Sequence, residues 1–128
     1  MVRDRLADWY VRKQGLKNSH FRTMTAMSRG ETPGPESSIN KLVSATKYQE
    51  VSFFGMELQE MLGIVTDPDT VALDGLFQSG ALSSPGYRIA GGTDEILRNI
   101  IAERVLGLPQ DVRLDKVGSF RDLPTGDK

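Results

Sequence analysis

Two long stretches of helical periodicity dominate the first half of this sequence. One covers residues 2–28 and the other runs from Pro35 to about Gly63, with a turn at residues 29–34 between them. Helices of about 25 residues are each about 38 Å long, so such a short turn forces them to run antiparallel. The apolar row of the first stretch consists of Val2, Leu6, Trp9, Leu16, Met24 and Met27, with Lys13 and His20 completing it.

The second half predicts two shorter helices. A weaker helix is expected from residue 71 to 82, followed by a loop at residues 83–90 and a final helix at residues 93–106. No alternating strand pattern competes with these helices. We therefore expect an all-α fold, an up-down four-helix bundle over residues 1–109, and an extended tail at residues 110–128.

Composition excludes several classes of protein. The 128 residues fit one domain, and 16 basic against 17 acidic residues without a basic stripe give no electrostatic argument for nucleic acid. The chain has no cysteine and a single histidine, His20, so we predict neither a disulfide nor a metal site. No apolar run reaches the length of a membrane span, and a cytoplasmic location is expected. Because helical periodicity starts at once, we expect the chain to be part of a longer protein.

A double glycine, Gly91–Gly92, immediately precedes the final predicted helix. Thr93 is placed to cap this helix, and Asp94 and Glu95 lie in its first turn, where acidic groups suit the helix dipole. A helix start behind a glycine turn can receive a polar or anionic ligand through its free N–H groups. An ordinary turn before an amphipathic helix explains the same pattern, so the residues alone leave both interpretations open.

The run GGTDEILRNIIAERVLGLP at residues 91–109 resembles the C-terminal signature of the acyl-CoA dehydrogenases. A second run, RGETPGPESSINKL at residues 29–42, resembles the link between two helices of the same domain. The resemblance covers most of residues 1–109 and does not cover a whole enzyme. It implies the C-terminal helical bundle of a dehydrogenase whose other domains are an α-helical domain and a β-domain.

This resemblance also implies a chemistry and a set of site residues. The family removes hydrogen from the α and β carbons of acyl-CoA thioesters and passes the electrons to FAD. Thr93, Asp94 and Glu95 match positions that contact FAD, and Gly92 matches the residue beside the substrate. Gly91 stands where many members carry the glutamate base, so the base is expected upstream or on a partner, or else the chain is inactive. Ala90 replaces an aromatic residue common in the family.

Three functions therefore remain open from the sequence. The first is the C-terminal domain of an FAD-dependent acyl-CoA dehydrogenase, inactive as this chain alone. The second is a non-catalytic assembly subunit of a split or heteromeric dehydrogenase, and the third is a helical bundle without a ligand. The family implies a homo- or hetero-oligomer, typically a tetramer, with acyl-CoA as substrate and a flavoprotein as electron acceptor. Arg98 and Arg104 are candidates for cofactor phosphate, although pairing with Glu95 or Glu103 explains them equally well.

Overall fold

The computed structural model describes residues 1–67, 69–110, 119 and 121, and within these ranges it contains helices and no strand. The all-α prediction is therefore confirmed. The helices are α1 (Val2–Ser28), α2 (Ser37–Leu58), α3 (Leu76–Ile89) and α4 (Asp94–Ile100). Two short 3-10 helices, η1 (Glu60–Ile64) and η2 (Ala72–Gly75), lie between α2 and α3, and a π-helical turn, η3 (Ile101–Val105), extends α4. Almost all of the predicted tail at residues 110–128 lies outside the described residues.

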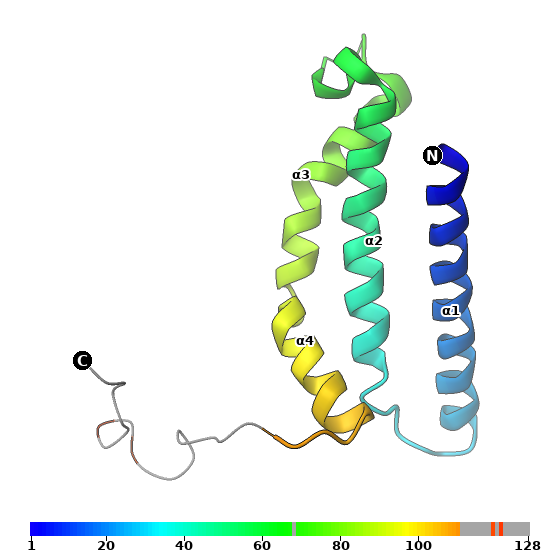
Figure 1. Ribbon diagram of the computed structural model, residues 1–128, viewed down its shortest axis with the longest axis vertical. Helices are drawn as coiled ribbons and strands as arrows, with labels where there is room; N and C mark the ends of the chain where they lie inside the picture. Colours follow the sequence, from blue (N-terminus) through cyan, green and yellow to red (C-terminus); the bar gives the residue numbers. More distant parts are fainter. Residues whose placement is uncertain (68, 111–118, 120, 122–128) are drawn as a thin grey trace.

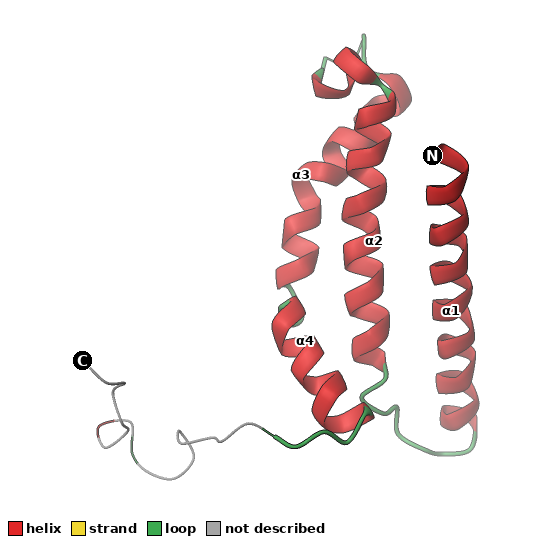
Figure 2. Cartoon of the chain, viewed as in Figure 1, coloured by secondary structure: helices red, strands yellow, loops and turns green. Residues whose placement is uncertain are grey.

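Helix α2 is the centre of the arrangement. α1 runs antiparallel along one flank of α2, while α3 returns along the other flank and α4 continues in the same direction as α3 (Figure 1). Figure 2 shows the loop between α1 and α2 at one end of the layer, the short helical turns between α2 and α3 at the other end, and a short break between α3 and α4 partway along. The predicted antiparallel pairing of the first two helices is confirmed, and α2 is the element through which the other helices are held together.

The α2–α3 contact is close because small residues lie where the two helices meet. A Cβ atom at Gly55 would lie 2.2 Å from the ring of Phe77, and one at Gly80 would lie 2.4 Å from the Ser52 hydroxyl. The buried apolar residues of the described chain are Ala45, Phe54, Ala81 and Leu97. Because three of these four lie on α2 and α3, the core follows the α2–α3 seam.

Helix α1 is attached more loosely and has no buried residue. The Trp9 ring meets Phe54 edge-on at 5.4 Å, and its Nε1 donates to Glu50 at 3.2 Å. Arg12 donates to the same carboxylate at 2.9 Å, and this contact with Glu50 raises the pKa of Arg12. Much of the apolar row recognised in the sequence stays open, since Leu6 is 53% exposed. α1 therefore presents an apolar surface that the described part of the chain leaves exposed.

The predicted loop at residues 83–90 is wrong, because α3 continues through Ile89. Pro85 has no N–H to donate to the Ala81 carbonyl four residues earlier. The hydroxyl of Ser84, a fully buried residue, donates to that carbonyl at 3.0 Å instead. A side-chain donor thus replaces the missing backbone donor, and the helix passes through the proline.

Two other predicted boundaries are also wrong. The third helix does not begin at residue 71, because Leu73, Asp74 and Gly75 all have positive φ values and α3 starts only after them. The α-helical part of α2 ends at Leu58 rather than near residue 63. The final helix ends at Val105, within one residue of its predicted end, but it changes to a π turn after Ile100, where the Leu106 N–H donates to the Ile101 carbonyl at 3.0 Å.

The α2–α3 seam predicts opposite effects for two glycine substitutions. We expect Gly55→Ala to lower the free energy of unfolding by about 1–3 kcal/mol, because the new methyl group overlaps the Phe77 ring. Gly15→Ala is the matched control, since a Cβ at Gly15 meets nothing within 4 Å and alanine favours a helix by up to about 1 kcal/mol. Chemical denaturation followed by far-ultraviolet circular dichroism measures both. Equal effects of the two variants would contradict this account of the seam.

Candidate functional site

The Gly91–Gly92 turn joins the end of α3 to the start of α4. Gly91 has φ 71° and Gly92 has φ 108°, both in the region that favours glycine. A Cβ at Gly91 would meet nothing within 4 Å, so the backbone conformation rather than lack of space requires glycine there. The turn fixes the direction in which α4 leaves α3 and places its opening residues beside α2.

Lys41 on α2 holds this turn in place through two hydrogen bonds to backbone carbonyl groups. Its ammonium group donates to the Gly92 carbonyl at 2.6 Å and to the Arg88 carbonyl at 3.2 Å. Carbonyl groups at a helix C-terminus lack intrahelical partners, and a lysine is a suitable donor to them. Lys41 therefore caps α3 from a neighbouring helix and fixes the peptide that leads into α4.

Arg88 makes the second link across the turn. Its Nε donates to the Asp94 carboxylate at 2.8 Å, its Nη2 contacts the same oxygen, and its Nη1 donates to Gln49 at 2.8 Å. Asp94 is buried at 3% exposure, and Arg88 is the cation that contacts its carboxylate. Through Arg88 the last turn of α3, the middle of α2 and the first residue of α4 form one network.

Thr93 and Glu95 form the open edge of the site. Thr93 is the N-cap of α4, as predicted, and its hydroxyl accepts from the Ile96 N–H at 3.4 Å. Glu95 is exposed, and hydrogen bonds from its own backbone N–H and from the Thr93 hydroxyl hold the pKa of this carboxyl below its usual value. Glu95 thus stays ionised at the helix start, where negative charge is favourable.

Two cavities flank the turn on different faces of α3. One of about 270 Å³ is lined by Gln49, Pro85, Arg88, Ile89, Thr93, Asp94 and Glu95. The other, of about 460 Å³, is lined by residues of α2 together with Tyr87 and Ala90. All three residues predicted to contact FAD therefore line one cavity, and Ala90, next to Gly91, lines the other.

The polar groups that line the cavity of about 270 Å³ indicate whether it can hold a nucleotide cofactor. Thr93 and Glu95 offer a hydroxyl group and a carboxylate that remain accessible, which suits the hydroxyl and amino groups of a nucleotide. The Asp94 carboxylate already contacts Arg88, and its other oxygen is buried without a hydrogen-bond partner. The geometry fits a cofactor contact at Thr93 and Glu95, while Asp94 serves the ion pair in this structure.

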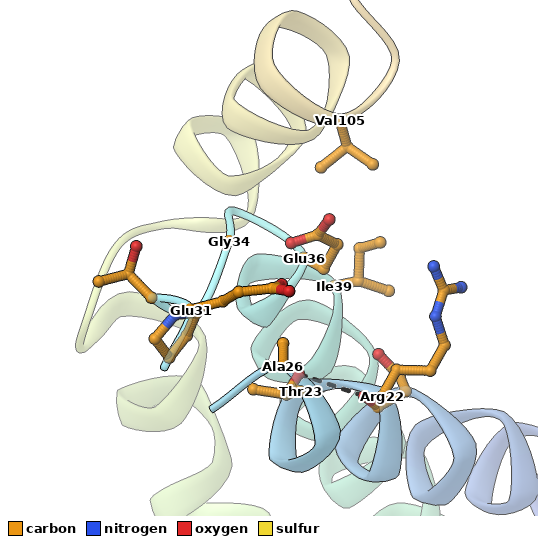
Figure 3. Close-up of a pocket in the computed structure, with 11 residues that line it drawn as sticks. Arg22, Thr23, Ala26, Glu31, Gly34, Glu36, Ile39 and Val105 are labelled. Carbon is orange, nitrogen blue, oxygen red and sulfur yellow. Dashed lines mark hydrogen bonds between the residues drawn. The ribbon is translucent and has the colours of Figure 1, made fainter. Parts of the chain in front are cut away.

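A larger cavity of about 590 Å³ lies at the opposite end of α1 from its N-terminus. In Figure 3 the side chains of Glu31 and Glu36 lie between α1 and Val105, with Thr23 and Ala26 on the α1 side. None of the site residues predicted from the resemblance, Gly91 to Glu95, lines this cavity. Its lining comes from α1, from the 29–42 segment and from Val105 of the π turn, and it includes neither Gly91 nor Gly92.

Comparison with known proteins decides the family. The family described as "Acyl-CoA dehydrogenase, C-terminal domain" matches residues 1–106. This chain belongs to that family. The acyl-CoA dehydrogenase IpdE1 of Mycolicibacterium smegmatis is 34% identical over 116 residues, which cover 88% of this chain and 27% of that protein. FadE34 of Mycobacterium tuberculosis is 35% identical over 81 residues, covering 63% of this chain and 10% of that protein.

Solved structures show the same fold. The ChsE4–ChsE5 complex from Mycobacterium tuberculosis matches with a TM-score of 0.73 and 23% identity, covering 86% of this chain and 29% of the matched chain. The complex named Tcur3481–Tcur3483 steroid ACAD matches with a TM-score of 0.72 and 21% identity, over the same shares. This acyl-CoA dehydrogenase domain therefore spans less than a third of the length of these relatives.

Other residues singled out in the sequence lie apart from the turn. His20 is exposed on α1, and no group of three or more histidine, cysteine or acidic residues that could hold a metal occurs in the described ranges. None of the helices described is long and apolar enough to cross a membrane. Arg98 is exposed on α4 one turn after Glu95, which agrees with the intrahelical alternative for this arginine.

Sequence reasoning missed the residues that hold the turn in place. Arg88 and Gln49 carry no motif that links them to Asp94, because their contact depends on how α3 packs against α2. The role of Lys41 could have been predicted, since this residue lies in the RGETPGPESSINKL run at residues 29–42 that resembles the family. A positively charged residue in a segment that resembles a family linker was the available signal.

The ion pair predicts a large difference between two arginine substitutions. We expect Arg88→Met to lower the free energy of unfolding by about 2–4 kcal/mol, because it leaves the buried Asp94 carboxylate without its cation. Arg98→Met, on an exposed position of α4, should change the stability by less than about 0.5 kcal/mol. Urea denaturation of both variants is the measurement. A small effect of Arg88→Met would show that Asp94 finds another partner.

The Thr93–Glu95 contact predicts a shift in titration. Thr93→Val removes the hydroxyl donor, so the pKa of Glu95 should rise toward its usual value while the contribution of its own backbone N–H remains. Because the folded pKa is lowered, the ionised carboxylate stabilises the start of α4 above the unfolded pKa, and this is lost as pH falls through the folded pKa. Carboxyl NMR titration measures the shift, and an unchanged pKa in the variant would refute the contact.

Proposed function

We propose that this chain is the C-terminal helical domain of an FAD-dependent acyl-CoA dehydrogenase. The complete enzyme removes hydrogen from the α and β carbons of an acyl-CoA thioester and transfers electrons to FAD. Family membership supports this proposal, and the observation that carries it is the turn before α4, held by Lys41 and Arg88. A rigid turn of this kind suits a site that must place a cofactor and a substrate side by side.

Each residue around the turn receives a distinct role in this proposal. The Thr93 hydroxyl and the Glu95 carboxylate contact polar groups of FAD, because both remain accessible at the cavity edge. Gly92 lies beside the acyl thioester, where a residue without a side chain allows close approach. Asp94 orients the start of α4 through Arg88. When bound, FAD supplies the acceptor for the β-hydrogen as hydride, and this domain supplies binding and orientation.

The base that removes the α-proton lies outside this turn. Gly91 has no side chain to accept a proton, and its φ of 71° would strain any other residue there. This observation favours the second candidate function, a non-catalytic assembly subunit whose partner chain supplies the base. The two matched structures are complexes of two different named components, which supports such a pairing.

The open face of α1 supports an oligomer. Leu6, Tyr10 and Phe21 are each more than half exposed, and α1 buries no residue of its own. An apolar helix face of this kind marks a contact with another chain or domain. We place the assembly in the cytoplasm, as a homo- or heterotetramer that passes electrons to an acceptor flavoprotein.

The chain alone should not catalyse the reaction. We expect no acyl-CoA-dependent reduction of an electron acceptor by the 128-residue chain with added FAD, because it offers no base at Gly91. In the complete protein, FAD absorbance should bleach when acyl-CoA is added. One FAD per chain favours the dehydrogenase domain, and one FAD per pair of different chains favours the assembly subunit. A complete protein that stays colourless after incubation with FAD would exclude both.

Self-association is the second expectation from this proposal. The exposed α1 face should drive the chain into oligomers at micromolar concentration. Replacing Leu6 and Tyr10 by serine should shift the equilibrium toward monomer, whereas replacing the exposed Leu108 by serine should leave it unchanged. Sedimentation equilibrium measures the distribution. A parent chain that is strictly monomeric would count against the assembly role.

A further inference from the structure

A cavity of about 550 Å³ lies where α3 begins, at the opposite end of that helix from the Gly91–Gly92 turn. Its volume is within the range typical of ligand pockets. The lining includes Gly75, which is the N-cap of α3, and Gln78 and Ser79 from the first turn of the helix. It shares no lining residue with the two cavities beside the turn. This cavity is therefore separate from the proposed cofactor contact.

Gln78 carries a buried hydrogen-bond acceptor that the described part of the chain leaves without a donor. The residue is 4% exposed, and its Nε2 donates to the Leu62 carbonyl at 3.3 Å and to Gln59 Oε1 at 3.1 Å. Because a carbonyl group only accepts, the amide nitrogen of Gln78 must face Leu62. Oε1 is then buried without a partner. An unpaired buried acceptor is costly, so a donor that enters the cavity is stabilised there.

The start of α3 offers hydrogen-bond donors to the same cavity. The first N–H groups of a helix have no acceptor within the helix, and side chains often supply one. The N-cap of α3 is Gly75, and no side chain caps this helix. An acceptor atom of a ligand is therefore favourable beside the helix start, next to the donor that Gln78 requires.

The charges around the cavity favour a neutral ligand. Among the described residues that line it, Asp74 alone is charged, and its carboxylate disfavours an anion. The positive end of the α3 dipole lies at the same place and disfavours a cation. Val71 and Leu82 add apolar surface to the lining. A neutral group that has a donor next to an acceptor, on an apolar stem, matches all of these features.

We infer that this cavity binds a neutral carboxamide, whose N–H donates to Gln78 Oε1 and whose carbonyl oxygen faces the first N–H groups of α3. The apolar stem of the ligand lies against Val71 and Leu82. Since Oε1 is buried, the ligand enters with a local movement of a lining side chain, and Leu82 is free to move at 81% exposure. The inference is independent of the proposed function, because it uses no residue of the Gly91–Gly92 turn.

Binding of N-butylacetamide to the full 128-residue chain tests this inference. n-Butyl acetate is the matched comparison, because it has the same shape and carries an ester oxygen in place of the N–H. Nitrogen-15 NMR spectra should show saturable shifts of the Gly75 and Ser79 amides and of the Gln78 side-chain NH2 group with N-butylacetamide. The ester should bind at least about 5-fold more weakly, since it cannot donate to Oε1.

A third probe identifies the source of the carboxamide, which a small molecule and a peptide both supply. N-acetylglycine N-methylamide carries two peptide groups on a short backbone. Tighter binding of this probe than of N-butylacetamide would identify a peptide segment as the ligand. Tighter binding of N-butylacetamide would identify a small-molecule amide, and either result supports a carboxamide site.

Three variants locate the binding. Gln78→Met removes the acceptor, so N-butylacetamide and n-butyl acetate should bind it equally. Leu82→Trp fills the cavity from an exposed position and should weaken binding at least about 10-fold, which keeps the test decisive if Gln78→Met fails to fold. Val11→Trp adds the same ring at an exposed position of α1 and should leave binding unchanged.

Asp74→Asn separates a carboxamide site from a cation site. Asparagine tolerates the positive φ of 53° at this position, so the fold should persist. Binding of N-butylacetamide should change by less than about 2-fold in this variant. The inference is overturned if n-butylammonium binds more tightly than N-butylacetamide and loses affinity in Asp74→Asn. Absence of saturable binding, equal binding of the ester to the parent chain, or unchanged binding by Leu82→Trp would also overturn it.

Discussion

The charged network at the junction of α3 and α4 holds the site together. Only residues 90–93 separate the two helices, so the negative end of one helix dipole faces the positive end of the next. Lys41 and Arg88 supply positive charge to the carbonyl end of α3, and Asp94 supplies negative charge at the start of α4. Each charge is favourable for its own helix end, and together they fix the glycine turn between them.

This network depends on the close packing of α2 and α3. Lys41 and Gln49 reach the junction because Gly55 and Gly80 allow the two helices to approach, as the short Cβ distances at both glycines show. α1, by contrast, is attached to α2 mainly through the contacts that Trp9 and Arg12 make with Glu50. The molecule therefore has a firmly packed half that positions the turn and a loosely attached helix that leaves an apolar surface.

The sequence predicted the elements whose signals are local. The bounds of α1, the antiparallel α1–α2 pair and the Thr93 cap follow from periodicity, chain length and capping chemistry, and all three are confirmed. The predicted loop at residues 83–90 is instead part of α3, which passes through Pro85, and the Ser84 hydroxyl that replaces the missing donor is a contact visible only in three dimensions. The Arg88–Asp94 ion pair could not be predicted either, because its contribution to stability depends on the burial of Asp94, which the sequence does not show. The cofactor contacts at Thr93, Asp94 and Glu95 and the substrate contact at Gly92 stay predictions.

The π turn at η3 has a consequence for the far end of the molecule. A turn closed between Ile101 and Leu106 contains one residue more than an α-helical turn, so every later side chain is rotated by about 100° relative to regular helix. Val105, the last residue of this turn, lies near the segment that links α1 to α2, where Figure 3 shows it above Glu36. The extra residue is confined to this one turn, and it changes the direction in which the chain continues after the helix.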